Sequence, residues 1–227
     1  FNLVRGPITR LHTHENSLLF VTHHIVADWR SMGVIAADIK SEYDKRLLGQ
    51  EQAPSETSGD GEPDLLFVES TMVRKDVDEI AAKENLDHWY RYLTHDRKGK
   101  FEILDLASDF RRELSLHTAA GSIPIFLGNN LTQRLVKQAS KKNLTLFNTV
   151  FGAWFLTLHM MAKEADDITL GTPFDLRSKS TSSSQISSSV GCFSSILPVR
   201  SKISDTQSMA EFLKQLMSRT LESFDHP

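Results

Sequence analysis

Residues 23–31 carry the densest group of chemically active side chains, with the adjacent pair His23 and His24, then Asp28 and Ser31. Neighbouring histidines in a strand point to opposite faces, so one can face a cavity while the other packs inward. Histidine exchanges protons near neutral pH, and a buried carboxylate needs a cation or several hydrogen bonds. The pattern is compatible with acid–base chemistry, but a histidine pair at a strand end is more often only a polar edge.

Metal and thiol chemistry have weaker support. His12 and His14 alternate on a strand-like stretch and could bind a metal, but such a pair is more often surface polarity. His23 and His24 point apart, so they do not converge on one ion, and we expect no metal site. Cys192 is the only cysteine, which excludes an internal disulfide and fits a reducing, cytoplasmic compartment. We expect it to be a small buried side chain rather than a nucleophile.

Composition excludes several other classes of protein. The net charge of −3 offers no basic surplus for a nucleic-acid partner, and no apolar run reaches the roughly 18 residues that a membrane span needs. The sequence contains neither a Gly-x-Ser-x-Gly nucleophile turn nor a glycine-rich phosphate-binding motif. The histidine cluster therefore remains the main candidate for chemistry.

The flanking sequence predicts the elements that position this cluster. Residues 17–23 form a short apolar run that is typical of a strand ending at the histidines. After Asp28, apolar residues recur every four positions over 35–47, which predicts a helix. Either Asp28 or Ser31 can cap the start of that helix. We therefore expect the histidines between a strand and a helix.

The rest of the chain mixes helical and extended patterns without a fixed repeat. We expect strands over 121–127, 167–174 and 190–199. We expect helices over 64–93 and 146–161, one that Asn130 caps and that ends near Asn143, and one after a capping box at 208–211. The helix over 146–161 is apolar almost all round, which is typical of a buried helix. Polar residues over 49–63, 94–100 and 178–189 predict loops. The fold class is mixed α/β, with a boundary between two lobes near Lys100.

The cluster at 23–31 resembles the His-His-x-x-x-Asp-Gly motif of the condensation domains of nonribosomal peptide synthetases. Other stretches resemble segments of this family, in family order: Phe1-Asn2-Leu3-x-x-Gly6-Pro7-Ile8-x-Arg10, Asn85-Leu86-Asp87-His88-Trp89, Leu104-Asp105-Leu106-x-x-Asp109-x-Arg111, Thr145-Leu146-Phe147, Asp166-Asp167-Ile168-x-Leu170-Gly171-Thr172-Pro173 through Arg177, and Val190-Gly191-Cys192-Phe193-Ser194-Ser195-x-Leu197-Pro198-x-Arg200. The resemblance therefore covers nearly the whole chain.

The resemblance implies two lobes of the chloramphenicol acetyltransferase fold that form a V with the site between them. Residues 1–100 would be the later part of the N-terminal lobe, with the motif, and 101–227 the first part of the C-terminal lobe. Both lobes would be incomplete, since the chain starts at Phe1 and stops at Pro227 within structured segments. We therefore expect a fragment of a longer domain.

The resemblance also implies an activity. In this family a donor acyl or peptidyl thioester and an acceptor aminoacyl thioester, each on the 4'-phosphopantetheine arm of a carrier domain, meet in a tunnel and form an amide. The implied partners are upstream and downstream carrier domains and an adjacent adenylation domain, and the domain itself binds no cofactor. His24 is the implied catalytic residue, His23 supports the loop, and Asp28 pairs with Arg177.

The chain departs from the family pattern at two positions. Trp29 stands where the motif has glycine, and Ser195 stands where the later strand has asparagine. With Ser31, these two residues are the candidates for lining the tunnel.

Three alternatives stay open. An epimerisation domain shares the histidine motif but needs a second acid or base, usually a glutamate, and we find no convincing glutamate over 172–199. A heterocyclisation domain would need aspartate in place of a motif histidine, which disfavours it. The third alternative is a catalytically impaired domain that only docks carrier proteins, and the departures at Trp29 and Ser195 favour it.

Overall fold

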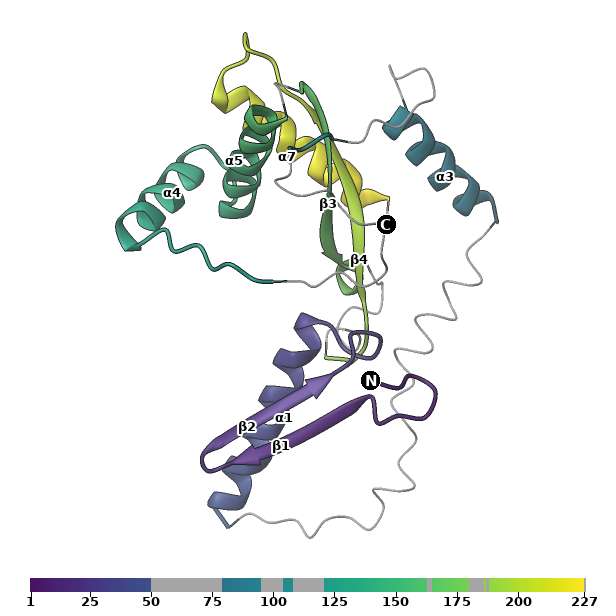
Figure 1. The fold of residues 1–227 in the computed structure, drawn as a ribbon, viewed down its shortest axis with the longest axis vertical. Helices are drawn as coiled ribbons and strands as arrows, with labels where there is room; N and C mark the ends of the chain where they lie inside the picture. The colour runs from purple at the N-terminus through teal and green to yellow at the C-terminus, as the bar shows by residue number, and fades with distance from the viewer. Residues whose placement is uncertain are drawn as a thin grey trace. The chain divides into compact units, whose positions relative to one another are not determined.

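The computed structural model describes residues 1–49, 79–94, 104–107, 121–162, 165–179, 186 and 188–226. The chain divides into two compact units, here called unit 1 (Phe1–Ala82 with Pro173–Ile196) and unit 2 (Lys83–Thr172 with Leu197–Pro227). Figure 1 shows their elements. The lobe boundary predicted near Lys100, and most of the loops predicted over 49–63, 94–100 and 178–189, lie outside the described residues.

Unit 1 begins with an antiparallel hairpin of β1 (Thr9–His14) and β2 (Ser17–Thr22), in which Thr9 lies opposite Thr22 (Figure 1). Helix α1 (Trp29–Leu47) follows, and the side chain of its N-cap Asp28 accepts a hydrogen bond from the Ser31 backbone N–H. The strand and the capped helix predicted on either side of the histidines are thus confirmed.

The apolar stripe of α1 does not bury a large core. Together with β2 it lines an open groove of about 370 Å³, formed by Leu18, Phe20, Met32, Ile35, Ala36, Ile39, Lys40 and Tyr43. The most buried side chains of the described part of unit 1 include four polar ones, Asp28, Ser31, Arg177 and Ser189. Unit 1 is therefore organised around a polar centre.

Unit 2 contains a conventional apolar core. Its buried members are Ala139, Leu144, Phe155, Leu158, Ile168, Val199, Phe212, Leu213 and Leu216. They come from α4 (Asn129–Lys141), α5 (Leu146–Met161), α7 (Met209–Asp225) and the paired strands β3 (Asp167–Asp175) and β4 (Ser194–Lys202), with Leu144 in the turn between α4 and α5. Helix α3 (Glu79–Thr94) confirms the end of the helix predicted over 64–93.

The helix starts in unit 2 follow local sequence signals. Ser208 and Glu211 form the predicted capping box at the start of α7, and the Thr145 side chain caps α5 by accepting from the Asn148 N–H. At α4 the predicted cap, Asn130, is two residues late, because the helix starts at Asn129 and its N-cap is Gly128, with φ +71°. Glycine suits that left-handed backbone, which has no side-chain cap.

Two predictions for unit 2 are wrong. Residues 121–127 form no strand, and Ile123 and Ile125 are 89% and 80% exposed. Their alternation finds no partner strand among the described residues. Helix α5 is not buried all round, since Phe155 and Leu158 are buried while Phe147 and Trp154 are exposed.

In the described ranges no single helix is long and apolar enough to cross a membrane, and α4 with α5 meet that test only as a pair bent by 106°.

Strand β4 starts at Ser194 rather than at the predicted Val190. Backbone groups of Gly191 and Phe193 form hydrogen bonds with side chains of Asp28, Ser31 and Arg177 instead. The Gly191 N–H and carbonyl and the Phe193 N–H are therefore occupied by side chains, although the Phe193 carbonyl still accepts from the Leu176 backbone N–H at 2.9 Å. Gly191 and Phe193, which were predicted to be part of this strand, therefore belong to the polar centre of unit 1.

Candidate functional site

The polar centre of unit 1 is built on a bidentate ion pair between Asp28 and Arg177. Arg177 Nη1 donates to Asp28 Oδ2 at 2.7 Å and Nη2 donates to Oδ1 at 3.1 Å. The side chain of Asp28 is only 4% exposed, and that of Arg177 only 1%. The pairing that the resemblance implied is thus present, and it satisfies a buried carboxylate in the geometry that favours arginine.

Three further donors surround the Asp28 carboxylate. They are the Ser31 backbone N–H at 2.9 Å, the Ser31 hydroxyl at 2.8 Å and the Phe193 N–H at 3.0 Å. Burial alone would raise the pKa of Asp28, but the hydrogen bonds from Arg177, Ser31 and Phe193 outweigh it and lower that pKa to about 2. Asp28 is therefore ionised at neutral pH, which suits a structural anion and not a proton donor.

Ser31 joins the ion pair to the segment before β4. It is fully buried, and its Oγ accepts hydrogen bonds from the Gly191 N–H and from Arg177 Nη2, both at 3.0 Å. The same oxygen lies 2.9 Å from the Gly191 carbonyl. The hydroxyl therefore supports the loop from within and does not face solvent.

The two histidines differ in their surroundings. His23 is half-buried, its Nδ1 accepts a hydrogen bond from the Ile25 N–H at 3.1 Å, and its ring packs edge-on against Phe1. His24 is exposed, and its Nδ1 lies 3.6 Å from the Sγ of Cys192. The loop therefore holds the His23 imidazole inward and presents the His24 imidazole outward.

Trp29 and Ser195 lie outside this network. Trp29 is the first residue of α1 and is 91% exposed, while Ser195 is half-buried on β4. The contact of Cys192 with His24 was missed from the sequence, where Cys192 was interpreted only as a small buried residue. The signal available was its place directly after Gly191, in the stretch that resembles a family motif.

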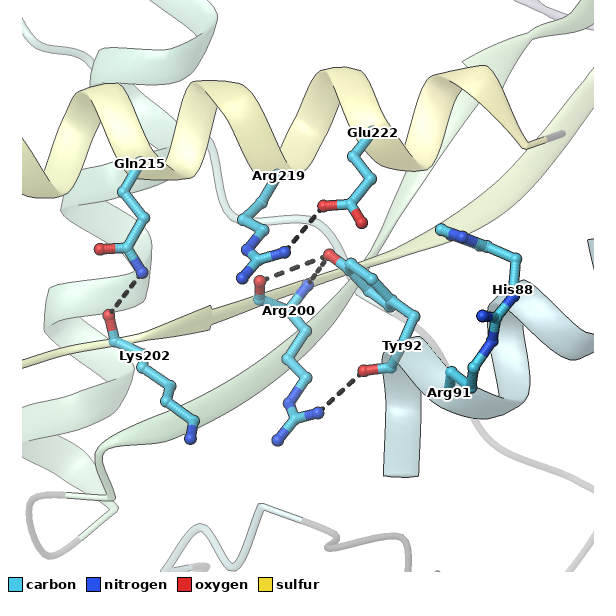
Figure 2. A pocket seen from close by; sticks show the side chains of 8 residues that line it. All are labelled: His88, Arg91, Tyr92, Arg200, Lys202, Gln215, Arg219 and Glu222. Carbon is cyan, nitrogen blue, oxygen red and sulfur yellow. Dashed lines mark hydrogen bonds and ion pairs between the residues drawn. The ribbon is translucent and has the colours of Figure 1, made fainter. Parts of the chain in front are cut away.

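A separate pocket of about 540 Å³ lies in unit 2. Its lining residues, drawn in Figure 2, are His88, Arg91, Tyr92, Arg200, Lys202, Gln215, Arg219 and Glu222. Arg200 donates to Asp167 at 2.9 and 2.6 Å, and Arg219 pairs with Glu222 at 2.8 Å. Burial, followed by the nearby His226, lowers the pKa of His88. Much of the pocket's positive charge is thus paired within the unit, and none of the predicted site residues lines it.

Within the described ranges, no group of three or more His, Cys, Asp or Glu side chains is arranged to hold a metal ion. His12 and His14, weighed above as ligands, are both exposed on β1. The group that the site offers for chemistry is the exposed imidazole of His24, on a loop held by the buried Asp28–Arg177 ion pair.

Comparison with solved structures assigns the fold. The chain superposes on a four-domain nonribosomal peptide synthetase, holo-AB3403 bound to AMP and glycine, with a TM-score of 0.77 and 21% identity, covering all of this chain and 16% of that one. It also matches the condensation domain of the Monacolin K polyketide synthase MokA, with a TM-score of 0.70 and 17% identity, covering 100% of this chain and 50% of that one. These are mixed α/β folds of the condensation type.

The sequence comparison gives the family. The Condensation domain profile matches residues 2–227, so the chain belongs to the condensation domain family. Tyrocidine synthase 2 of Brevibacillus parabrevis is 25% identical over 225 residues, which are 99% of this chain and 6% of that protein. Malpinin synthetase of Mortierella alpina is 28% identical over 232 residues, spanning 100% of this chain and 3% of that protein. The chain thus matches a small part of large synthetases.

Proposed function

We propose that this condensation domain forms an amide bond between a carrier-bound donor thioester and the amine of a carrier-bound acceptor. The acceptor nitrogen attacks the donor carbonyl carbon, the donor thiolate leaves, and the proton lost by nitrogen balances the thiolate. The match of residues 2–227 to the family carries the proposal. Upstream and downstream carrier domains deliver both substrates on 4'-phosphopantetheine, an adenylation domain is the adjacent partner, and the domain binds no cofactor of its own.

His24 is the residue that we propose contacts the reacting groups. Its ring is exposed, while the loop that carries it is fixed through Asp28 and Arg177. An α-ammonium has a pKa of about 8, so a strong base is not required to free the amine. Holding two tethered substrates in one place supplies much of the acceleration, which leaves His24 either to take the proton or to stabilise the transition state.

The proposed setting is a V of two lobes, 1–100 and 101–227, with a tunnel between them. Trp29 and Ser195 are its proposed lining residues, since neither side chain is engaged in the Asp28 network. Ser31 is assigned to loop support because its hydroxyl is fully buried.

A reconstitution with loaded donor and acceptor carrier domains tests the activity. We expect the native protein to form the amide and His24→Ala to slow it by about 100-fold or more, the usual loss when a positioned acid–base group is removed. His12→Ala, which removes an exposed histidine from β1, is the matched control. An unchanged rate in His24→Ala would exclude the assignment of His24.

One observation favours a second candidate, a domain that docks carriers without catalysis. The indole of Trp29 replaces the motif glycine directly beside the loop, and an indole adds much more volume than glycine leaves free. The same assay decides, with Trp29→Gly as the variant. If the native protein binds loaded carriers but forms no amide, and Trp29→Gly forms it, the docking function replaces the catalytic one. A chiral analysis of the donor tests the epimerisation alternative, because an epimerisation domain would invert the α-carbon of the carrier-bound substrate.

A further inference from the structure

The thiol of Cys192 lies against the ring of His24. The Sγ and Nδ1 atoms are 3.6 Å apart, which is hydrogen-bond distance for sulfur. Cys192 is half-buried and His24 is exposed, so the contact sits at the surface side of the polar centre. Both residues belong to unit 1. The contact engages the Nδ1 nitrogen of the imidazole.

The backbone on both sides of Cys192 is fixed to the histidine loop. Before it, the Gly191 N–H donates to Ser31 Oγ at 3.0 Å, and the Gly191 carbonyl accepts from Arg177 Nη2 at 3.3 Å. After it, the Phe193 N–H donates to Asp28 Oδ2 at 3.0 Å, and the Phe193 ring lies under the Arg177 guanidinium at 4.1 Å. The buried ion pair therefore sets the position of the thiol.

The chemistry of the two groups decides which one donates. A neutral thiol carries a proton and is a weak acceptor, whereas an unprotonated imidazole nitrogen is a good acceptor. The favourable arrangement is therefore S–H donating to Nδ1. Since a neutral imidazole has one N–H, the proton of His24 then lies on Nε2. The ring of His23 is arranged in the same way, because its Nδ1 also accepts a hydrogen bond, from the Ile25 N–H.

We propose that Cys192 is a positioning residue that holds His24 in the Nε2–H tautomer. The proposal rests on His24 being the residue that contacts the reacting groups. In that tautomer the free nitrogen of His24 is a hydrogen-bond donor. It therefore stabilises the negative charge that develops on the donor carbonyl oxygen, and the proton of the amine passes through solvent to the leaving thiolate. Of the two roles open to His24, the thiol selects transition-state stabilisation.

Two spectroscopic measurements on the full chain test the tautomer without any activity assay. Nitrogen-15 NMR of labelled histidine reports which ring nitrogen carries the proton, with the His24 signals assigned from their loss in His24→Gln. We expect Nε2–H in the native protein, an unchanged signal in Cys192→Ser, and a ratio of Nε2–H to Nδ1–H about threefold lower in Cys192→Ala, as for one lost hydrogen bond. The His23 signals are the internal control for folding.

The S–H stretching band gives the direction of the hydrogen bond, because Cys192 is the only cysteine in the chain. We expect the band at a lower frequency in the native protein than in His24→Gln, as for a donating thiol. Native His24 in the Nδ1–H form, or the same tautomer ratio in Cys192→Ala as in the native protein, would overturn the proposal. So would a native band at the frequency of His24→Gln.

The amide-forming assay then separates this proposal from the proposed function. We expect Cys192→Ala to lower kcat by about threefold at unchanged KM, and Cys192→Ser to restore it, because only the proton on His24 differs between them. If the native protein forms no amide but the spectra agree, the proposed function fails while the tautomer stands. If the amide forms but the spectra disagree, the positioning role fails alone.

Discussion

Replacing Asp28 by alanine tests whether the polar centre holds unit 1 together. The carboxylate accepts from both terminal nitrogens of Arg177, from Ser31 and from the Phe193 N–H, and it caps α1. Removing one member of a buried ion pair costs about 3–5 kcal/mol, because the other charge stays buried without its partner. We therefore expect the free energy of unfolding of Asp28→Ala to fall by about 3–5 kcal/mol, cap included.

Asp175→Ala is the matched control for this experiment. Its carboxylate contacts Arg177 Nη1 at 3.2 Å, accepts from the Arg177 N–H at 3.1 Å and pairs with Arg30 at 3.4 Å, but the side chain is 33% exposed rather than 4%. Each pair with a solvated partner contributes about 0–1 kcal/mol, so the control should lose clearly less than Asp28→Ala. Urea unfolding followed by circular dichroism at pH 7 measures both variants. Losses for Asp28→Ala and Asp175→Ala within about 1 kcal/mol of each other would refute the reasoning, and Asp28→Asn extends the comparison if the alanine variant does not fold.

Two further predictions concern pH and packing. The folded pKa of Asp28, about 2, is below its ordinary value of 3.8, so its stabilisation is present above pH 4 and lost as the pH falls toward 2. The stability difference between the native protein and Asp28→Asn should shrink by about 2 kcal/mol over that interval, and a constant difference would contradict this. A Cβ at Gly152 would clash with Leu213 Cδ2, so Gly152→Val should cost about 1–3 kcal/mol in thermal unfolding. Gly33→Ala on α1 meets nothing within 4 Å and should instead stabilise by about 0.5–1 kcal/mol; equal effects of the two changes would show that packing at Gly152 is not limiting.

The elements with strong local signals were predictable from sequence. The cap and stripe of α1, and the capping box of α7, each depend on residues within one or two turns of each other. The strand expected over 121–127 failed because alternation says only that one face can be buried, and no partner strand is present among the described residues. The prediction that α5 is buried all round failed for a related reason, because an apolar helix surface does not specify which elements pack against it.

The site divides in the same way. His23, His24 and Asp28 were found from residue type and spacing, whereas the pairing of Asp28 with Arg177 came only from the family resemblance. The Cys192 contact and the buried hydroxyl of Ser31 could not be predicted, because both arise where segments far apart in the chain meet. A hydrogen bond across such a separation leaves no periodic trace in the sequence.

The distances along the chain within the polar centre also fix when the centre can form. Asp28 bonds to Arg177 across 149 residues and to Phe193 across 165, so the closing of the network is a long-range event. Such contacts form slowly because the loop-closure entropy is lost before any contact compensates for it. On the ribosome, the segment from β1 to α1 emerges long before Arg177 does. Arg177 therefore cannot fix the histidine loop until 149 further residues have been synthesised, and until then the Asp28 carboxylate lacks this cation.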